Sequence, residues 1–382
     1  MKIALYNLTT TVLTGGIETF NWEVGRELTS RGHEVHIYGG EAGLAPQYDL
    51  PVYTYPFKSR RDYPRLGLRF QKMAERWSMA RNCLDDLRRG AYDVIIIHKP
   101  YDLPWIIRAA HQSGSRVAFC SGGTEFFPGY AWLVKKLDLF TACSSFNAGQ
   151  IEQYCGVRPK VLYNGVDTDC FQPLPAEDSL KKQLLPAPGA LVVFSAARLK
   201  RFKGFQYVIE AVARLQSEFP NLFYLIAGEG NYRTELEACA QRCQVTDRVI
   251  FLGTVPHQQL ARYYSIADVA LFPSLHLETF GISIAEAMSC GVPVIGSDSG
   301  GIPEVIGDAG FLSPPADSVH LAGNLSKLLR DKELRRKLRA QGRQRMVQGF
   351  TWKHTVDRLE EYLAEGVADS LAAKRGETAD FR

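Results

Sequence analysis

Two glutamates, Glu278 and Glu286, stand eight positions apart in the stretch LETFGISIAEA. A carboxylate only accepts hydrogen bonds, so it suits the recognition of paired sugar hydroxyls. A helix is predicted to begin near Ile282, which leaves the amides of Phe280, Gly281 and Ile282 able to bind a phosphate or sugar oxygen. The neighbours of Glu286 are apolar, which argues against an exposed helix residue. We therefore expect both carboxylates to face one site.

Two cations precede a helix in the stretch SAARLKRFKGF. Arg198 and Lys203 lie five residues apart around a bend, and Gly204 opens the next helix. Such a pair suits a diphosphate, because Arg binds as a planar fork and Lys as a point charge. The alternative is a solvated basic loop, which is the interpretation that we favour for Lys200 and Arg201.

Glycine pairs mark two further turns. Gly15 and Gly16 in TTTVLTGGIETF could bring backbone amides close to a phosphate at a helix start, although a simple helix-starting turn is equally compatible. Gly228 and Gly230 match two thirds of a dinucleotide-binding fingerprint, but Arg233 stands where the third glycine would be. A phosphate-side turn at Gly230 is therefore favoured over a nicotinamide site.

The elements that must position these residues form two series of short apolar strands. The runs are continuously apolar, as expected for parallel strands buried on both faces. Helical patterns such as 17–31 and 102–113 lie between them. The expected strands are 2–7, 34–38, 93–97, 116–120 and 139–143, followed by 191–196, 222–227, 248–253, 268–272 and 293–297.

A Pro-, Asp- and Gly-rich linker, 163–190, separates the two series. Repeated strand–helix units on each side predict an α/β protein with two doubly wound, Rossmann-like domains facing across a cleft. We place the N-terminal domain at 1–166, the second domain at 167–350, and a C-terminal helix with its tail at 351–382, where the helix packs back on the first domain.

Composition and length restrict the class of protein and the cellular compartment that we expect. The chain has 382 residues, 46% hydrophobic and 23% charged, which is ordinary for a globular protein of two domains. Eight scattered cysteines without a CxxC pair suit a reducing compartment. Because no apolar run reaches transmembrane length and the N-terminus lacks a signal-peptide core, we expect a cytoplasmic protein. A nucleic-acid partner is not expected, because no such module is recognised.

A basic segment, 58–89, carries ten Lys or Arg and four Asp or Glu, a net charge of +6 against +4 for the whole chain. At helical spacing its cations and its large apolar residues form two neighbouring faces. Such a helix suits an anionic membrane surface or a phosphorylated lipid acceptor, and hence a peripheral position on the inner face of a membrane. A core-packed helix with a solvated basic side is equally compatible. The two faces are Arg65, Arg69, Lys72 and Arg76, and Leu66, Phe70, Met73 and Trp77.

The segment from Glu278 to Glu286 resembles the E-x7-E signature of glycosyltransferase family 4, whose members have the GT-B fold. The stretches GGIETF, YNGVDTDCFQP, ARLKRFKGF, AGEGNYRTELE, FLGTVPHQQL, YYSIADVALFPS and AEAMSCGVPVIGSDSGGIPEVI occur in that family's order and spacing. The resemblance covers about residues 1–360. It implies transfer of a hexose from a UDP- or GDP-sugar to a glycan, glycolipid or small-molecule acceptor, with retention of anomeric configuration. It also implies that the domain at 1–166 binds the acceptor and the domain at 167–350 binds the nucleotide sugar.

The resemblance also implies roles for individual residues. Glu286 would hold the ribose hydroxyls and Glu278 the hydroxyls of the donor hexose. Arg198 and Lys203 would neutralise the diphosphate as catalytic groups. Donor-binding amides would come from the glycine turns and the helix start, and the base would lie against the loop that contains Val255. The remaining donor-binding positions would be Gly15, Gly16, Gly230, Phe280, Gly281 and Ile282.

No metal and no cofactor are expected, because two fixed cations and a helix N-terminus can stabilise the leaving diphosphate. Asp167 and Asp169 match the DxD metal motif of a different glycosyltransferase fold, but they fall in the segment between the domains. We interpret that match as a coincidence.

One position departs from the family, which often has a His where this chain has Gly122. His98, at the end of a strand, and Glu125 are the candidate replacements for sugar or acceptor contacts. His98 could equally be a strand-end residue whose hydrogen bonds are satisfied internally. Alternative functions are a GT-B nucleotide-sugar isomerase or sugar phosphorylase, or a non-catalytic nucleotide-binding protein.

Overall fold

The computed structural model describes residues 1–175, 177–185, 189–276 and 278–377, and for 178 and 366–377 only the backbone. The chain divides into two units. Unit 1 contains Met1–Asn164 and the segment from Trp352 onward, and unit 2 contains Gly165–Thr351. Both divisions fall close to the expected limits of 166 and 350. Each unit is described by itself below.

Unit 1 is built on a seven-stranded parallel sheet in the order β3-β2-β1-β4-β5-β6-β7. All five strands expected here from the sequence are confirmed. β3 and β7 are additional. β3, at the sheet edge, has two half-buried end residues and two exposed central residues, and β7 has two residues, so neither shows a continuous apolar run. The strands are β1 (Lys2–Tyr6), β2 (Glu34–Gly40), β3 (Val52–Tyr55), β4 (Val94–Ile97), β5 (Arg116–Ser121), β6 (Leu139–Ala142) and β7 (Lys160–Val161).

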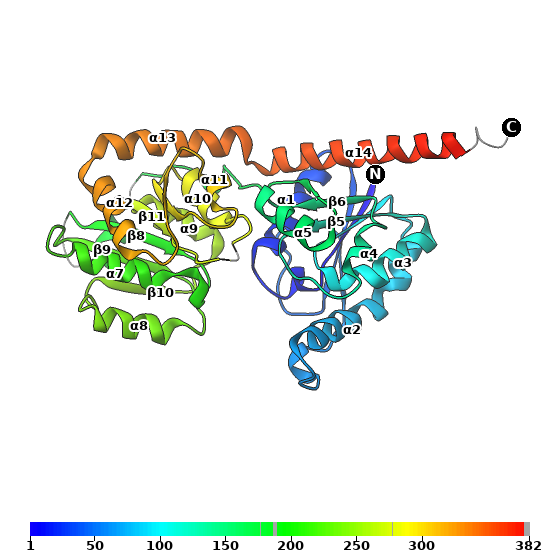
Figure 1. The fold of residues 1–382 in the computed structure, drawn as a ribbon, viewed down its shortest axis with the longest axis horizontal. Coiled ribbons are helices and arrows are strands. Elements are labelled where there is room, and N and C mark those ends of the chain that lie inside the picture. The colour runs from blue at the N-terminus through cyan, green and yellow to red at the C-terminus, as the bar shows by residue number, and fades with distance from the viewer. Residues whose placement is uncertain (176, 186–188, 277, 378–382) are drawn as a thin grey trace. The chain divides into compact units, whose positions relative to one another are not determined.

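Helices cover both faces of this sheet (Figure 1). One buried cluster includes α2 and α3, and the other includes α1 and α14. In α14, Trp352, Val356 and Leu359 are almost fully buried, and Glu360 accepts a 2.6 Å hydrogen bond from Arg31 on α1. The C-terminal helix thereby completes the core of unit 1. The helices are α1 (Gly16–Ser30), α2 (Leu68–Arg89), α3 (Leu103–Ser113), α4 (Tyr130–Val134), α5 (Ser145–Cys155) and α14 (Trp352–Glu377).

Helix α2 lies in the basic segment. The core-packed alternative expected its apolar face in the core and its basic face in solvent, but part of each face is oriented the other way. Arg76, expected on a solvated face, is 4% exposed and pairs with the fully buried Asp102 at 2.7 Å. The apolar residues Phe70 and Trp77 are exposed. The helix can turn this way because small and apolar residues of its second half, Met79 among them, enter the core instead.

Unit 2 contains a six-stranded parallel sheet in the order β10-β9-β8-β11-β12-β13. The five strands expected from the sequence are confirmed to within one residue. β13 is additional, and only three residues long. The strands are β8 (Leu191–Ala196), β9 (Leu222–Ala227), β10 (Val249–Gly253), β11 (Val269–Phe272), β12 (Val294–Ser297) and β13 (Phe311–Ser313).

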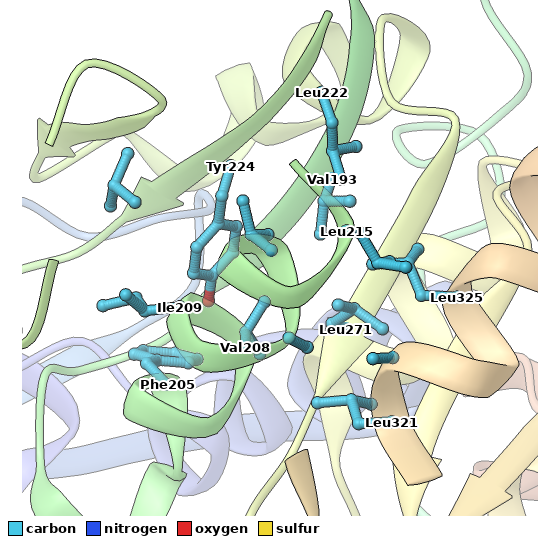
Figure 2. Packing of buried hydrophobic residues seen from close by; sticks show 14 of the residues in the cluster. Val193, Phe205, Val208, Ile209, Leu215, Leu222, Tyr224, Leu271, Leu321 and Leu325 are labelled. Carbon is cyan, nitrogen blue, oxygen red and sulfur yellow. The ribbon is translucent and has the colours of Figure 1, made fainter. Parts of the chain in front are cut away.

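The core of unit 2 lies between this sheet and helices α7, α8 and α12 (Figure 2). Val193, Tyr224 and Leu271 contribute the strand side chains, and Val208 and Ile209 come from α7. The segment expected as a linker belongs to unit 2 from residue 165 onward and includes α6. The helices are α6 (Asp178–Leu184), α7 (Phe205–Leu215), α8 (Arg233–Arg242), α9 (Leu260–Ser265), α10 (Ile282–Ser289), α11 (Ile302–Ile306), α12 (Ser318–Arg330) and α13 (Lys332–Gly349).

Each sheet has one position where the strand order reverses. It lies between β1 and β4 in unit 1 and between β8 and β11 in unit 2. At such a position, the loops that follow two neighbouring parallel strands run in opposite directions. Open α/β sheets bind ligands in the space between these loops. The residues expected to do chemistry follow β8, β9, β10 and β11 in unit 2, and β1, β4 and β5 in unit 1.

Candidate active site

The loops after β8 and β11 are held together by backbone contact. Gly204 has a φ of +73°, and a Cβ at this position would lie 1.9 Å from the Pro273 carbonyl oxygen. The Leu275 amide donates a 2.7 Å hydrogen bond to the carbonyl of Phe202. Only glycine permits both the left-handed conformation and this approach. The two loops that span the switch point of unit 2 are therefore fixed against each other.

This contact brings Lys203 and Glu278 together. The Lys203 ammonium forms an ion pair with the Glu278 carboxylate, and each side chain is 20% exposed. Each group thus neutralises the other in the structure without a bound substrate. A ligand that carries both phosphate and hydroxyl groups could engage the two partners separately.

Arg198 lies at the same edge of the sheet and is exposed. Among the described residues it has no hydrogen bond or ion pair, so its guanidinium is available to an anionic ligand. Its neighbour Leu199 is fully buried, and the Leu199 amide donates to the Glu229 carbonyl at 3.0 Å. The loop that carries the cation is therefore anchored although the cation itself is solvated.

The glycines after β9 are packed against the loop after β8. A Cβ at Gly228 would lie 2.1 Å from the Ala197 carbonyl oxygen, and a Cβ at Gly230 would lie 2.1 Å from that of Leu199. These contacts explain both glycines without a ligand. Contact between Gly230 and a phosphate stays a prediction.

Glu286 is 3% exposed and lies on α10, whose neighbouring residues are buried as expected. Its Oε1 atom is 2.6 Å from Nε2 of His257, which follows the loop after β10 that contains Val255. The imidazole of His257 also contacts the ring of Phe171, with 5.1 Å between centroids. The pairing was not predicted, because the sequence carries no signal that joins residues from β10 and α10. His257 stands at the end of the loop that was expected to contact the base.

The start of α10 is built by another close backbone contact. Gly281, at the N-cap, has a φ of +102°, and no side chain caps the helix. The Gly301 amide donates a 2.9 Å hydrogen bond to the Glu278 carbonyl, which fixes the loop before the helix. Phe280 is buried, whereas Ile282 is half-buried. The first turn thus keeps backbone donors for which the helix supplies no partner.

Gly15 and Gly16 are exposed at the start of α1 in unit 1. The carboxylate of Glu18, in the first turn, lies 2.7 Å from the position of a Cβ on Gly15. It also accepts a 2.5 Å hydrogen bond from Thr9. The positive end of α1 is therefore partly neutralised by a side chain of its own first turn.

His98 is 3% exposed at the end of β4, with Nδ1 3.0 Å from the Cys120 carbonyl and Nε2 2.6 Å from the Asn21 amide. Burial lowers the pKa of His98 to about 3, so the ring is neutral and has one N–H. The two ring nitrogens face the Cys120 carbonyl and the Oδ1 atom of Asn21, whose NH₂ group donates to the Thr10 hydroxyl at 2.7 Å. The ring is satisfied within unit 1, which favours the structural alternative.

Glu125 forms an ion pair with Lys72 of α2. Burial alone would raise the pKa of Glu125. The hydrogen bond from Lys72 and the positive charge of Lys99 outweigh this effect, so the pKa is lowered overall. Lys99 follows β4 at the switch point of unit 1 and has no hydrogen bond or ion pair within the described residues. Burial and the neighbouring charge of Arg76 lower the pKa of Lys99. Sequence reasoning missed this lysine, although it directly follows the strand DVIII and His98.

The candidate DxD motif is a backbone turn. Asp167 Oδ1 accepts hydrogen bonds from the amides of Asp169 and Cys170, each at 3.0 Å. Within the ranges that the structure describes, no group of three or more His, Cys, Asp or Glu side chains is placed to hold a metal ion. The same ranges contain no helix that is both long and apolar enough to cross a membrane.

Two parallel-sheet, Rossmann-like domains, with cations and carboxylates at the switch point of the second, define the GT-B class of glycosyltransferase. Residues 14–170 match the model for Glycosyltransferase Family 4, and residues 176–345 match the model for Glycosyl transferases group 1. The protein is a glycosyltransferase with an N-terminal domain of the first kind and a C-terminal domain of the second.

Similar proteins span nearly the whole chain. The N-acetyl-alpha-D-glucosaminyl L-malate synthase of Bacillus anthracis is 26% identical, over 94% of this chain and 96% of that protein. A GDP-mannose-dependent alpha-(1-6)-phosphatidylinositol monomannoside mannosyltransferase of Mycobacterium tuberculosis is 25% identical, over 91% and 94%. The structure of Anabaena HepE with UDP-glucose aligns with a TM-score of 0.78 at 22% identity, over 96% of this chain and all of that chain (100%).

Proposed function

We propose that the protein transfers a hexose from a UDP- or GDP-sugar to an acceptor hydroxyl, with retention and without a metal or cofactor. The observation that carries this proposal is the Lys203–Glu278 ion pair at the switch point of unit 2, with the unpaired Arg198 in the same loop as Lys203. The E-x7-E spacing from Glu278 to Glu286 supports retention.

In this mechanism the donor separates the ion pair. Lys203 transfers its hydrogen bonds from Glu278 to the diphosphate, where Arg198 supplies the second positive charge. The carboxylate of Glu278 then accepts hydrogen bonds from hydroxyls of the hexose. The bond between the anomeric carbon and the diphosphate oxygen breaks with its electron pair moving to the phosphate. The two cations stabilise the charge that develops there, and the acceptor oxygen bonds the anomeric carbon and releases its proton to the departing phosphate.

Glu286 is proposed to hold the ribose. Its carboxylate is almost fully buried, and one of its oxygens already contacts His257. A buried carboxylate with a fixed partner has a defined orientation, which suits a bidentate contact to two neighbouring hydroxyls. Either His257 moves aside when the nucleotide binds, or it holds one oxygen while the other binds ribose.

The acceptor is proposed to bind unit 1, where Lys99 and Glu125 follow β4 and β5. An unpaired, half-buried lysine at a switch point suits an acceptor with an anionic group. Similar proteins named for L-malate and for a phosphatidylinositol monomannoside are consistent with that choice. A glycan, a lipid-linked sugar and a small anionic molecule are the acceptor classes to test, in a protein expected in the cytoplasm or on the inner face of a membrane.

The first experiment identifies the donor. Thermal unfolding is measured with UDP, GDP and ADP and with their sugars, because a ligand that binds the native state raises the melting temperature. Incubation of the stabilising nucleotide sugar with candidate acceptors, followed by NMR of the product, reports transfer and its stereochemistry. An inverted product contradicts retention, and a donor sugar that stays intact with every acceptor supports a non-catalytic role.

The second experiment separates the two glutamates. Glu286→Gln should weaken binding of the free nucleotide diphosphate, whereas Glu278→Gln should leave that affinity nearly unchanged and lower kcat instead. Glu278→Gln should also relax discrimination between epimeric donor sugars, because a site built to bond a hydroxyl rejects analogues without it. Glu235→Gln, at an exposed position of α8, is the matched control. Equal loss of nucleotide binding in both site variants would contradict this assignment of roles.

A further inference from the structure

An exposed apolar stripe runs along the first half of α2. Of the fourteen large apolar side chains that are exposed among the described residues, five lie between residues 66 and 77. Phe70, Met73 and Trp77 recur at spacings of three and four, so they share one face of the helix. The first turns of α2 extend beyond the sheet of unit 1 (Figure 1). The five are Leu66 at 72%, Leu68 at 59%, Phe70 at 39%, Met73 at 42% and Trp77 at 45% exposed.

The stripe leads into a groove of about 410 Å³ between α2 and α3. Trp77 is shared by the stripe and the groove, and its ring lies 5.3 Å from that of Trp105 on α3. Of the six other lining residues, three are apolar, two are arginines and one is a glutamine. The lining residues are Trp77, Leu84 and Arg88 of α2, and Pro104, Trp105, Arg108, Ala109 and Gln112 of α3. We call the stripe and groove together the α2–α3 surface.

Cations without partners surround this surface. Arg65, Arg69, Arg81 and Arg108 are exposed, and the described residues provide none of them with a hydrogen bond or an ion pair. Arg88 differs, because it bonds Asp85 at 2.5 Å and Gln112 at 2.9 Å. The surface therefore presents apolar area together with uncompensated positive charge.

We propose that the α2–α3 surface binds an anionic phospholipid bilayer. Tryptophans place an apolar ring with a polar N–H at the boundary between acyl chains and headgroups, and arginines keep their guanidinium at the headgroups while their stems lie on apolar surface. Apolar burial and attraction to anionic lipid then act together. Nucleic acid would pair with the arginines but would leave the apolar stripe in water.

A second copy of the chain fits the same surface poorly. In a two-fold dimer each surface contacts its own equivalent, so the stripe would be covered but arginine would oppose arginine. A bilayer with anionic headgroups satisfies both the apolar area and the charge. The same helix carries Lys72, which pairs with Glu125 near the proposed acceptor site, so this surface would position a lipid-borne acceptor next to unit 1.

The test is flotation of the full chain with vesicles, without donor, so that it does not depend on transfer activity. Vesicles of phosphatidylcholine alone are compared with vesicles that also contain phosphatidylglycerol. The chain should float with the anionic vesicles only. Phe70→Ser/Trp77→Ser and Arg81→Glu/Arg108→Glu should each weaken partitioning by about tenfold or more. The melting temperature and nucleotide binding should stay native in both variants, because all four positions are exposed.

Matched controls carry the same changes elsewhere. Trp132→Ser alters a tryptophan that is 62% exposed on α4, and Lys337→Glu/Arg339→Glu reverses two exposed charges on α13. Both should bind vesicles as the wild type does. The proposal is overturned if the wild type ignores anionic vesicles, if either surface variant still binds them fully, or if both controls lose binding equally. It is also overturned if the apolar stripe instead mediates a dimer that light scattering detects and Phe70→Ser/Trp77→Ser abolishes.

Discussion

At the scale of single residues, the carboxylates of the proposed donor site both have partners within unit 2. Lys203 is bound to Glu278, and Glu286 is bound to His257. The Lys203–Glu278 pair avoids the cost of leaving either charge alone at low exposure. A nucleotide diphosphate sugar bound as proposed would replace these contacts, because it offers both phosphate oxygens and hydroxyls.

Lys203→Ala and Arg198→Ala should each remove most of the turnover and leave the fold intact. Loss of one charge-assisted contact to a leaving diphosphate costs about 2–4 kcal/mol in the barrier, or roughly 30- to 1,000-fold in rate. Lys200→Ala is the matched control, because Lys200 bonds Asn231 at 2.9 Å and is assigned no catalytic role. Steady-state kinetics measure the effect. Wild-type rates in either site variant would show that the phosphate site lies elsewhere.

His98 should make unit 1 less stable as the pH falls. Its pKa is lowered from 6.5 to about 3 by burial, so the unfolded chain binds a proton between these values while the folded chain does not. Stability from the neutral ring is thus complete above pH 6.5 and declines as the pH falls toward 3. The slope approaches about 1.4 kcal/mol per pH unit in that window.

Urea unfolding followed by tryptophan fluorescence measures the free energy of unfolding of unit 1 at each pH, because all five tryptophans lie in that unit. They are Trp22, Trp77, Trp105, Trp132 and Trp352. His98→Gln should lower the stability near neutral pH and flatten its pH dependence relative to the wild type. Parallel pH profiles for the two proteins would mean that His98 does not titrate in this way.

At the scale of elements, glycines set the distances between loops. The loops after β8, β9 and β11 meet backbone to backbone at Gly204, Gly228 and Gly230. A side chain at any of these positions would collide with a carbonyl oxygen of the neighbouring loop. The sequence pattern alone suggested phosphate contacts for glycines of this kind, whereas the structure shows that they first hold the loops at the correct spacing.

Gly204→Ala should therefore lower both stability and activity. The new Cβ would lie 1.9 Å from the Pro273 oxygen, at a φ of +73°. Strain and the forced loop shift should cost at least about 2 kcal/mol and displace the adjacent Lys203. Gly323→Ala is the control, since Gly323 lies in α12 with nothing within 4 Å of a Cβ. The Gly323→Ala change should raise the free energy of unfolding by about 0.5–1 kcal/mol. Calorimetry and kinetics distinguish the two, and equal melting temperatures would contradict the steric argument.

At the scale of the whole molecule, the chain crosses between its two units twice. It enters unit 2 at residue 165 and returns to unit 1 at residue 352. The returning helix α14 buries Trp352, Val356 and Leu359 in the core that contains α1. The C-terminal segment is thus part of unit 1, although the whole of unit 2 separates it in sequence from the rest of unit 1.

Transfer should continue in the presence of EDTA. In the proposed mechanism, Arg198, Lys203 and the backbone donors at α10 would supply the positive charge that a metal can otherwise bring. The initial rate is measured before and after chelation, with added magnesium or manganese as the reverse test. Complete loss of activity that either ion restores would revive Asp167 and Asp169 as candidate ligands.

Much of the fold could be predicted because its signals are local. Continuous apolar runs identified ten strands, and the positions of Arg198, Lys203 and Glu278 after strands predicted that they share an edge of the sheet. The misses have a common cause. β3, β7 and β13 are short or lie at sheet edges, where burial is incomplete and the apolar signal is weak. The orientation of α2 was not predicted, because the sequence did not decide whether its apolar face packs in the core or remains at the surface.

The sequence by itself determined the class of chemistry, since carboxylates, cations and glycines at strand ends are set by residue type and spacing. Only the tertiary structure decided which of these groups meet. Lys203 and Glu278 are 75 residues apart, and His257 and Glu286 are 29 apart, so their contacts depend on the order of the strands. It also decided that Arg76 is buried and Trp77 exposed, because the fully buried Asp102 is a partner that only packing against α2 supplies.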